Sequence, residues 1–81
     1  MKMKWVVLDV EPRPDFTLLL TFKGGKKRLF DFTPLLQNQI NQPLRNIEFF
    51  MQAKVHHHTV VWNEELDICP EYLYEHSVKV R

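Results

Sequence analysis

Residues 16–31, FTLLLTFKGGKKRLFD, decide the fold because they predict a β-hairpin. Large apolar residues recur at every second position of Phe16–Lys23, a period that is typical of a strand with one buried face. Gly24 and Gly25 accept the positive φ angles that a two-residue hairpin turn requires. Lys26–Asp31 then returns as the second strand.

The predicted turn also sets the pairing of the two strands. With the glycine pair as the whole loop, Leu20 lies opposite Leu29, and Asp31 lies opposite Leu18. An Asp at the end of a strand can accept amide hydrogen bonds from the next turn, and we expect this role for Asp31. The alternative is a buried carboxyl group with a raised pKa, which would be a candidate acid or base.

Further elements are expected on both sides of the hairpin. Lys4–Glu11 is rich in apolar residues and predicts a strand covered on both faces. Thr33 and Pro34 predict the N-cap and first turn of a short helix. The other predicted elements are a helix from Pro43, two short strands within Lys54–Trp62, a helix from Pro70 to about Glu75 and a fraying tail at Ser77–Arg81.

These elements predict an α+β fold in a single domain, residues 1–81. About four to five strands form an antiparallel sheet in the order β-β-β-α-α-β-β-α, with the short helices packed on it. A chain of 81 residues buries only a small core, so a homodimer is also expected, because association would stabilise it.

Composition excludes several classes of protein. A hydrophobic content of 44% argues against disorder, and a net charge of +1 provides no field to attract nucleic acid or a membrane. Cys69 is the single cysteine, so an internal disulfide is excluded and a reducing, cytoplasmic location is expected. The apolar run Trp5–Leu8 is too short for a membrane span or a secretion signal. No motif predicts a cofactor.

His56, His57 and His58 form the most prominent candidate site. On a strand, His56 and His58 share a face and could hold a metal with a third ligand from elsewhere, while His57 points away. The alternative is a solvated turn or edge strand whose polar residues prevent edge pairing.

Lys23, Lys26, Lys27 and Arg28 gather at the predicted hairpin turn. They predict either a contact point for phosphate or nucleic acid, or simply a solvated hairpin tip. Because the whole chain is nearly neutral, the solvated tip is favoured.

Acidic residues and the cysteine surround the last predicted helix. Asp67 lies three residues before Pro70 and is expected to cap the helix or hold the preceding loop. Glu71 and Glu75 share a helix face and are expected to be surface charges. Cys69 lies at the helix start, where a thiol pKa can fall, but no base is placed beside it. No catalytic residue is predicted.

Tyr72 and Tyr74 cannot both face the core, because they lie about 200° apart around a helix. One tyrosine is therefore expected at the surface. With Trp62, these residues form the predicted contact surface for a protein partner.

The C-terminal segment WNEELDICPEYLY resembles a family ending in which a tryptophan and a polar turn precede Asp-x-x-Pro-Glu-x-Leu-Tyr. The matching residues are Phe22, Gly25, Lys26, Phe30, Asp31, Pro34, Leu35, Leu36, Leu44, Phe50, Trp62, Asp67, Pro70, Glu71, Leu73 and Tyr74. They are similar to the bacterial domain-of-unknown-function family 2442 (DUF2442) over about residues 4 to 76. The resemblance implies structural roles for Asp31, Trp62, Asp67, Pro70, Glu71, Leu73 and Tyr74.

The resemblance also implies a compact α+β fold and a context for function. Some relatives carry a helix-turn-helix domain after this one, for which this chain has no room before Arg81. Members are often encoded beside another small protein, which implies an antitoxin-like or regulatory role toward an adjacent gene product. Two departures stand out: Glu64 and Glu65 replace a glycine in the turn after Trp62, which changes the expected turn geometry, and histidines replace a more acidic loop.

The sequence therefore predicts a small cytoplasmic protein without catalytic activity that acts through protein–protein contact. One alternative is a metal- or small-ligand-binding module that uses the histidine run. A second alternative is a nucleic-acid accessory protein that uses the basic hairpin tip.

Overall fold

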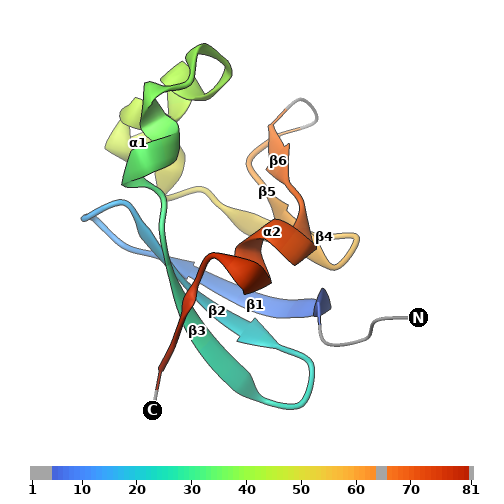
Figure 1. Ribbon diagram of the computed structural model, residues 1–81. Helices are drawn as coiled ribbons and strands as arrows, with labels where there is room; N and C mark the ends of the chain where they lie inside the picture. The colour runs from blue at the N-terminus through green and yellow to red at the C-terminus, as the bar shows by residue number, and fades with distance from the viewer. Residues whose placement is uncertain (1–4, 64–65, 81) are drawn as a thin grey trace.

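A computed structural model describes residues 5–63 and 66–80 (Figure 1). One antiparallel sheet has the strand order β1-β2-β3-β7, and a second has the order β4-β5-β6. The strands are β1 (Val7–Pro12), β2 (Thr17–Phe22), β3 (Lys26–Asp31), β4 (Lys54–His56), β5 (Thr59–Val61), β6 (Asp67–Ile68) and β7 (Val78–Lys79). The helices are η2 (Thr33–Gln37), η3 (Gln39–Arg45), α1 (Ile47–Phe50) and α2 (Pro70–Glu75), of which η2 and η3 are 3₁₀ helices.

The predicted α+β class with antiparallel pairing and short helices is confirmed. The structure differs in dividing the strands between two sheets and in adding β6 and β7. Helix α2 lies across one face of the four-stranded sheet, while η2, η3 and α1 gather at one end of the molecule (Figure 1). In the part of the chain that the structure describes, no helix is long and apolar enough to cross a membrane.

The β2–β3 hairpin forms as predicted, but its register differs by one residue. Lys23 joins the glycines in a three-residue turn, so Phe22 pairs with Lys26, and the predicted opposition of Leu20 and Leu29 is wrong. The Gly25 amide donates to the Phe22 carbonyl at 3.0 Å and closes the turn. Because a one-residue shift moves every side chain to the other face, the observed register puts apolar residues of both strands on one face.

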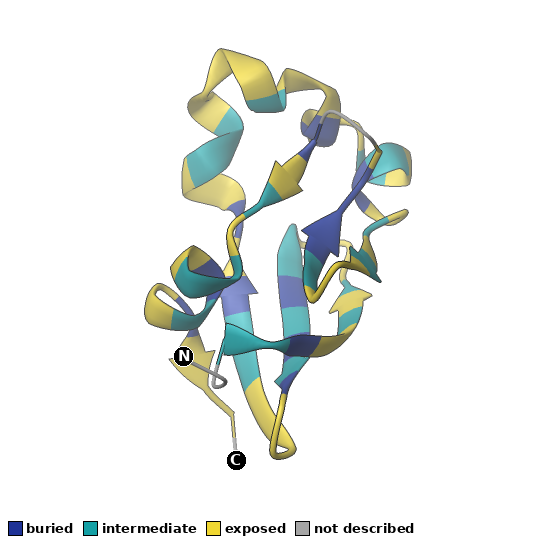
Figure 2. Cartoon of the chain, turned by 90° about the vertical axis from the view of Figure 1, so that its right-hand side faces the viewer, coloured by how far each residue is buried: buried dark blue, intermediate teal, exposed yellow. Residues whose placement is uncertain are grey.

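That inner face carries the core. Leu18, Leu20 and Phe22 are fully buried along β2, and Phe30 joins them from β3. Buried residues recur along the strands of both sheets in Figure 2. The buried cluster as a whole consists of Val7, Leu18, Leu20, Phe22, Phe30, Phe32, Leu44, Phe50, Val60, Trp62, Leu66 and Leu73.

Asp31 is exposed and accepts from the Thr33 amide at 3.0 Å and from the Thr33 hydroxyl. Its predicted role in the turn after β3 is therefore confirmed, while its predicted position opposite Leu18 is wrong, since it pairs with Thr17. Thr33 is not the N-cap of the next helix. Phe32 takes that position and provides no side-chain cap.

Several other predicted boundaries are wrong. Pro43 lies inside η3 and does not begin a helix; α1 begins at Ile47, where Asn46 accepts from the Glu48 amide at 2.9 Å. The first strand is not covered on both faces, because Leu8, Asp9 and Glu11 are exposed. The predicted strand start at Lys4 and the turn change at Glu64 and Glu65 lie outside the described residues.

The C-terminal segment, which the sequence predicts as a tail, joins the sheet as β7, and Arg81 lies outside the described residues. Val78 pairs with Leu29, and Lys79 pairs with Arg28. The Arg28 side chain donates through Nε to Ser77 Oγ and through Nη2 to the Ser77 carbonyl, both at 2.7 Å. Strand pairing and these two hydrogen bonds together hold β7 against β3.

Candidate interaction surface

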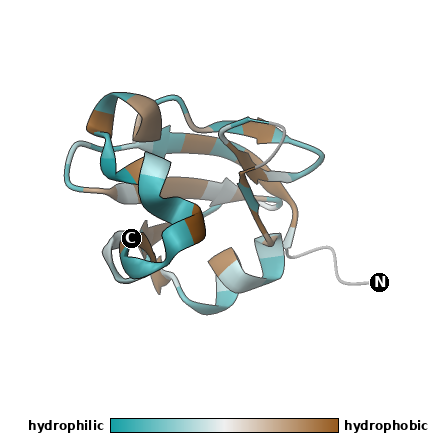
Figure 3. Cartoon of the chain, turned by 90° about the horizontal axis from the view of Figure 1, so that it is seen from above, coloured by the Kyte–Doolittle hydropathy of each residue, from teal (hydrophilic) through white to brown (hydrophobic). Residues whose placement is uncertain are grey.

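The four-stranded sheet has an outer face opposite the core. Because side chains alternate along a strand, Leu19 and Leu29 point away from the side that buries Leu18 and Phe30. The pairing aligns Leu19 with Leu29 and Leu29 with Val78, so these residues form a row across β2, β3 and β7, which we call the outer row. The alternation of hydrophobic and hydrophilic residues along the strands is visible in Figure 3.

The outer row is open to solvent. Val78 is 62% exposed, and Leu19 and Leu29 are half-buried. Leu8, which is 54% exposed, lies in a bulge of β1 between Val7 and Asp9 and is not part of the outer row. Contiguous apolar surface of this kind differs from the single exposed hydrophobic residues that are normal in proteins.

Charged residues border the outer row on two sides. Glu11 pairs with Leu19 at one end of the row, and Asp9 lies two residues before it on β1. Lys27 lies on β3 and pairs with Thr21. All three charged residues are exposed. The outer face is therefore apolar in the middle, acidic along β1 and basic at Lys27.

Of the three aromatic residues predicted to meet a partner, Tyr72 is the most exposed. It is 38% exposed, its ring packs at 6.0 Å from Phe30, and it stacks on His76 at 4.1 Å between centroids. Tyr74 is half-buried against Phe22, with 5.0 Å between the ring centroids. Both tyrosine rings therefore contact phenylalanines of the core, and Tyr72 is the more exposed of the two.

Trp62 belongs to the core. It is 5% exposed, and its indole nitrogen donates to the Phe50 carbonyl at 3.0 Å. The ring also packs against Phe32 at 5.4 Å. The indole thus ties the second sheet to the C-terminal end of α1 and leaves little surface for a partner.

The three histidines do not form one strand. His56 ends β4, whereas His57 and His58 form the turn to β5 with φ angles of 52° and 68°. The strand alternation that places His56 and His58 on one face therefore does not apply. Instead the His56 and His57 rings meet at 4.0 Å, and the His58 carbonyl accepts from the Val7 amide at 3.0 Å. Among residues 5–63 and 66–80, no three His, Cys, Asp or Glu side chains gather as metal ligands.

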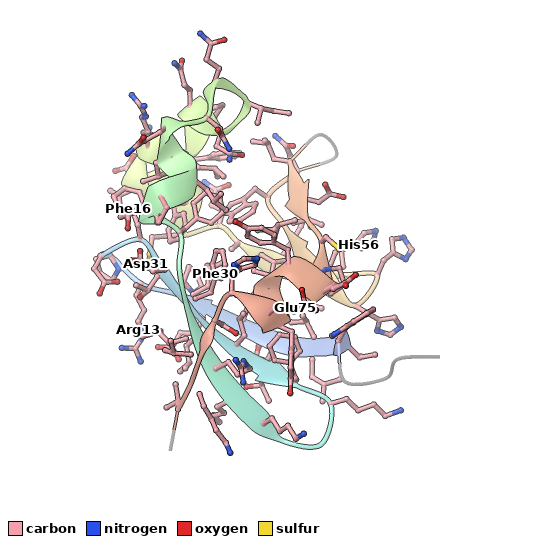
Figure 4. The ribbon with its side chains drawn as sticks, viewed as in Figure 1. Arg13, Phe16, Phe30, Asp31, His56 and Glu75 are labelled. Atoms are coloured by element: carbon pink, nitrogen blue, oxygen red, sulfur yellow. The ribbon has the colours of Figure 1, made fainter. Side chains whose placement is uncertain are left out.

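His56 does line a hollow of about 640 Å³ on the outer side of the second sheet. This histidine hollow is bordered by Lys54, His56, His57, Thr59, Val61, Trp62, Asn63 and Asp67. Figure 4 shows His56 on the opposite side of the molecule from Arg13 and Asp31. Pairing brings Asp67 beside Val61, and Val61 beside Lys54, so the hollow contains an acid, an amine and imidazoles.

The residues around α2 have structural positions. Asp67 lies in β6 and does not cap the helix, so the capping role is wrong, while its role in holding the preceding loop stays a prediction. Cys69 is the N-cap and provides no side-chain hydrogen bond. Cys69 is exposed, and His76 lies beyond the other end of the helix, so the two do not form a thiol–imidazole pair. Glu71 is in the first turn, where a negative charge suits the helix dipole, and Glu75 ends the helix.

A second hollow, of about 360 Å³, lies at the basic hairpin. Lys26, Lys27 and Arg28 line it as neighbours on β3, and Lys79 joins them from β7. Lys23 is not among the lining residues. The sequence predicted the basic cluster but not Lys79, because the pairing of β7 with β3 was not foreseen.

Asp15 carries the electrostatic feature that sequence reasoning missed. The Thr17 hydroxyl donates to the Asp15 carboxylate at 2.6 Å and lowers the pKa of Asp15 below its ordinary value of 3.8. The Thr17 amide donates to the same oxygen at 3.2 Å. The signal was the spacing Asp-x-Thr, which recurs at Asp31 and Thr33 with the same hydrogen bonds.

Antiparallel sheets, short helices and open hollows define a small α+β domain. Residues 7–79 match the family model described as protein of unknown function (DUF2442), and the chain belongs to this family. The matched range begins and ends three residues later than residues 4 to 76, over which the sequence resembles the family. No curated protein and no solved structure matches the chain.

Proposed function

We propose that the protein is a non-catalytic protein–protein interaction module whose partner docks on the outer face of the four-stranded sheet. The observation that carries this proposal is the outer row, in which Val78 is 62% exposed beside Leu19 and Leu29. Fully burying one such aliphatic side chain stabilises a complex by about 1.5–3 kcal/mol, and partial burial by less.

The charges around the row indicate the chemistry of the partner. Asp9 and Glu11 form an acidic border along β1. A partner with an apolar patch and basic residues beside it would complement both features, and opposite charges at the border would speed encounter and select the orientation. The occupant that we propose for the outer face is a protein of this chemistry. Binding of a second copy of this chain to the same face is the competing outcome.

We further propose a bacterial cytoplasmic setting, with an antitoxin-like or regulatory role toward an adjacent gene product as the first case to test. This part rests on the gene arrangement common among relatives. The exposed Tyr72 ring, stacked on His76, lies on α2 over the inner face of the sheet and would be a separate contact site.

The test uses Leu29→Glu and Val78→Glu, both in the outer row, with Ile40→Glu as a matched control. Ile40 is 72% exposed on η3, outside both sheets. Each protein is co-expressed with the adjacent gene product, and the complex is measured by gel filtration with light scattering. We expect the two sheet variants to lose the complex and the control to keep it.

Two results would count against this proposal. Equal loss from Ile40→Glu and Val78→Glu would show a general effect of surface charge. A purified wild-type dimer that Val78→Glu converts to monomer would make the second copy the occupant of this face.

The histidine hollow favours a second candidate, a small-ligand-binding module. Its volume of about 640 Å³ falls in the range of small-molecule sites, and it contains His56 and Asp67. The test is a thermal shift on adding zinc, with His56→Ala against His58→Ala as the control outside the hollow. No shift in the wild type, or equal losses in both variants, would remove the metal-binding form of this candidate.

A further inference from the structure

The hollow at the basic hairpin, which we call the basic hollow, concentrates positive charge in a chain whose net charge is only +1. Four of its lining residues are cationic, namely Lys26, Lys27, Arg28 and Lys79, and none is acidic. Surface cations are normally interspersed with carboxylates. This hollow therefore has a local positive potential that the whole-chain charge does not reveal.

Strand pairing puts three of these cations on one face. Arg28 lies directly opposite Lys79 across β3 and β7, and Lys26 precedes Arg28 by two residues on β3. Directly opposed residues have their Cβ atoms about 4.5–5.5 Å apart, and like charges at such positions destabilise a sheet. An anion bound between them would remove this repulsion.

Arg28 is held in place before any ligand arrives. Its Nε and Nη2 donate to Ser77, and its guanidinium carbon lies 4.5 Å from the centroid of the Tyr74 ring. Ser77 is itself buried, and its hydroxyl donates to the Tyr74 carbonyl at 3.0 Å. All these groups are neutral, so these contacts fix the guanidinium in place without neutralising its positive charge.

We propose that the basic hollow binds a phosphate group, either as free phosphate or carried by a small molecule. A fixed guanidinium fork beside lysine ammonium groups matches the geometry and charge of phosphate oxygens. The volume of about 360 Å³ is near the lower end for ligand sites and suits one phosphate with a small attached group. A long nucleic acid fits less well, because these cations fill one hollow and do not extend along a stripe.

The binding test is an NMR titration of amide shifts at constant ionic strength with chloride as the reference salt. The probes are inorganic phosphate, a nucleoside monophosphate, the same nucleoside without phosphate and a single-stranded DNA decamer. We expect both phosphate-bearing small probes to shift the amides of Gly25, Arg28 and Lys79, and the nucleoside to shift none. Comparison of the first two probes identifies the phosphate source.

The variant test measures phosphate binding by Lys26→Gln, by Lys79→Gln and by the double variant of both. Lys23→Gln is the control. All three residues are exposed lysines, so each variant loses the same charge without disturbing the core, but Lys23 does not line the hollow. We expect about tenfold weaker phosphate binding for the double variant of Lys26 and Lys79, and less than about a twofold change for Lys23→Gln.

Three results would overturn the proposal. The first is no amide shift with either phosphate-bearing small probe. The second is equal weakening by Lys23→Gln and Lys79→Gln, which would indicate diffuse attraction to the hairpin tip. The third is a response to the DNA decamer alone, which would make the hollow a nucleic-acid contact.

Discussion

The β2–β3 and β4–β5 hairpins reverse the chain with different residues. The first uses Lys23 and the two glycines, whose φ angles are 93° and 81°. The second uses only His57 and His58, whose φ angles are also positive, at 52° and 68°. The glycine turn thus has three residues and the histidine turn two, the opposite of what residue type alone indicates.

The comparison separates the place of a turn from its register. Glycines mark where a chain can turn, because positive φ is accessible to them without a steric penalty. The register is set by the strands, which shift until Leu18 and Phe30 share the buried face. Histidine is among the residues that enter the left-handed region more often than most, so a short turn without glycine can form.

The largest expected effect comes from the strand beside each turn. Phe22→Ala removes a fully buried ring and should cost about 3–5 kcal/mol of unfolding free energy, because a cavity remains. Val60→Ala on β5 removes much less volume and should cost about 2 kcal/mol. Urea unfolding measures both. Equal losses of unfolding free energy in Phe22→Ala and Val60→Ala would contradict a larger contribution of the first hairpin to the core.

Trp62→Phe tests the connection after the second hairpin. The change keeps an aromatic ring but leaves the buried Phe50 carbonyl without its indole donor. We expect a loss of about 1 kcal/mol in unfolding free energy by the same urea method, because the carbonyl still accepts from the Ala53 amide at 3.2 Å. An unchanged free energy of unfolding would contradict this role of the indole N–H group.

Substitutions in the two turns should change the free energy of unfolding in opposite directions. A Cβ at Gly25 would have no atom within 4 Å, so Gly25→Ala tests backbone strain alone and should cost about 1 kcal/mol. His58→Gly should stabilise by about 0.5–1 kcal/mol, since it relieves a positive φ. Thermal unfolding midpoints report both changes. A stabilising Gly25→Ala would contradict the assigned conformation.

The smallest effect is a pH dependence at Asp15, at the start of the first hairpin. Its pKa is lowered in the folded state by the Thr17 hydroxyl, so the ionised form is favoured by folding. The resulting stability is complete above the ordinary pKa of 3.8 and is lost as pH falls through the lower folded value. Unfolding curves of wild type and Asp15→Asn should therefore converge below about pH 4. A stability difference between wild type and Asp15→Asn that does not change with pH would contradict a role for the ionised Asp15 carboxylate.

Local chemistry in the sequence predicted much of the fold. Lys26–Asp31 and Pro70–Glu75 were predicted with the observed bounds, because a glycine turn and a helix-starting proline mark their ends. Strand β7 could not be predicted in this way. Val78–Lys79 is only two residues long, and it is a strand because Ser77 binds Arg28 from the far side of the sequence.

The candidate surfaces were predicted less well for the same reason. Helix geometry, which is local, predicts one exposed tyrosine, and Tyr72 is 38% exposed. The outer row depends on the register of β2, β3 and β7, and the basic hollow depends on Lys79 meeting Arg28. Pairings between distant segments have no short-range signature, so these surfaces could be found only in the folded chain.

The hydrogen bonds between Arg28 and Ser77 also bear on the order of folding. The two residues lie 49 positions apart, whereas the β2–β3 hairpin closes over a three-residue turn. Local pairs form early and distant pairs late, because closing a long loop costs more chain entropy. The first hairpin is thus placed to serve as a folding nucleus, and β7 to complete the sheet afterwards. Ser77→Ala should then speed unfolding far more than it slows folding.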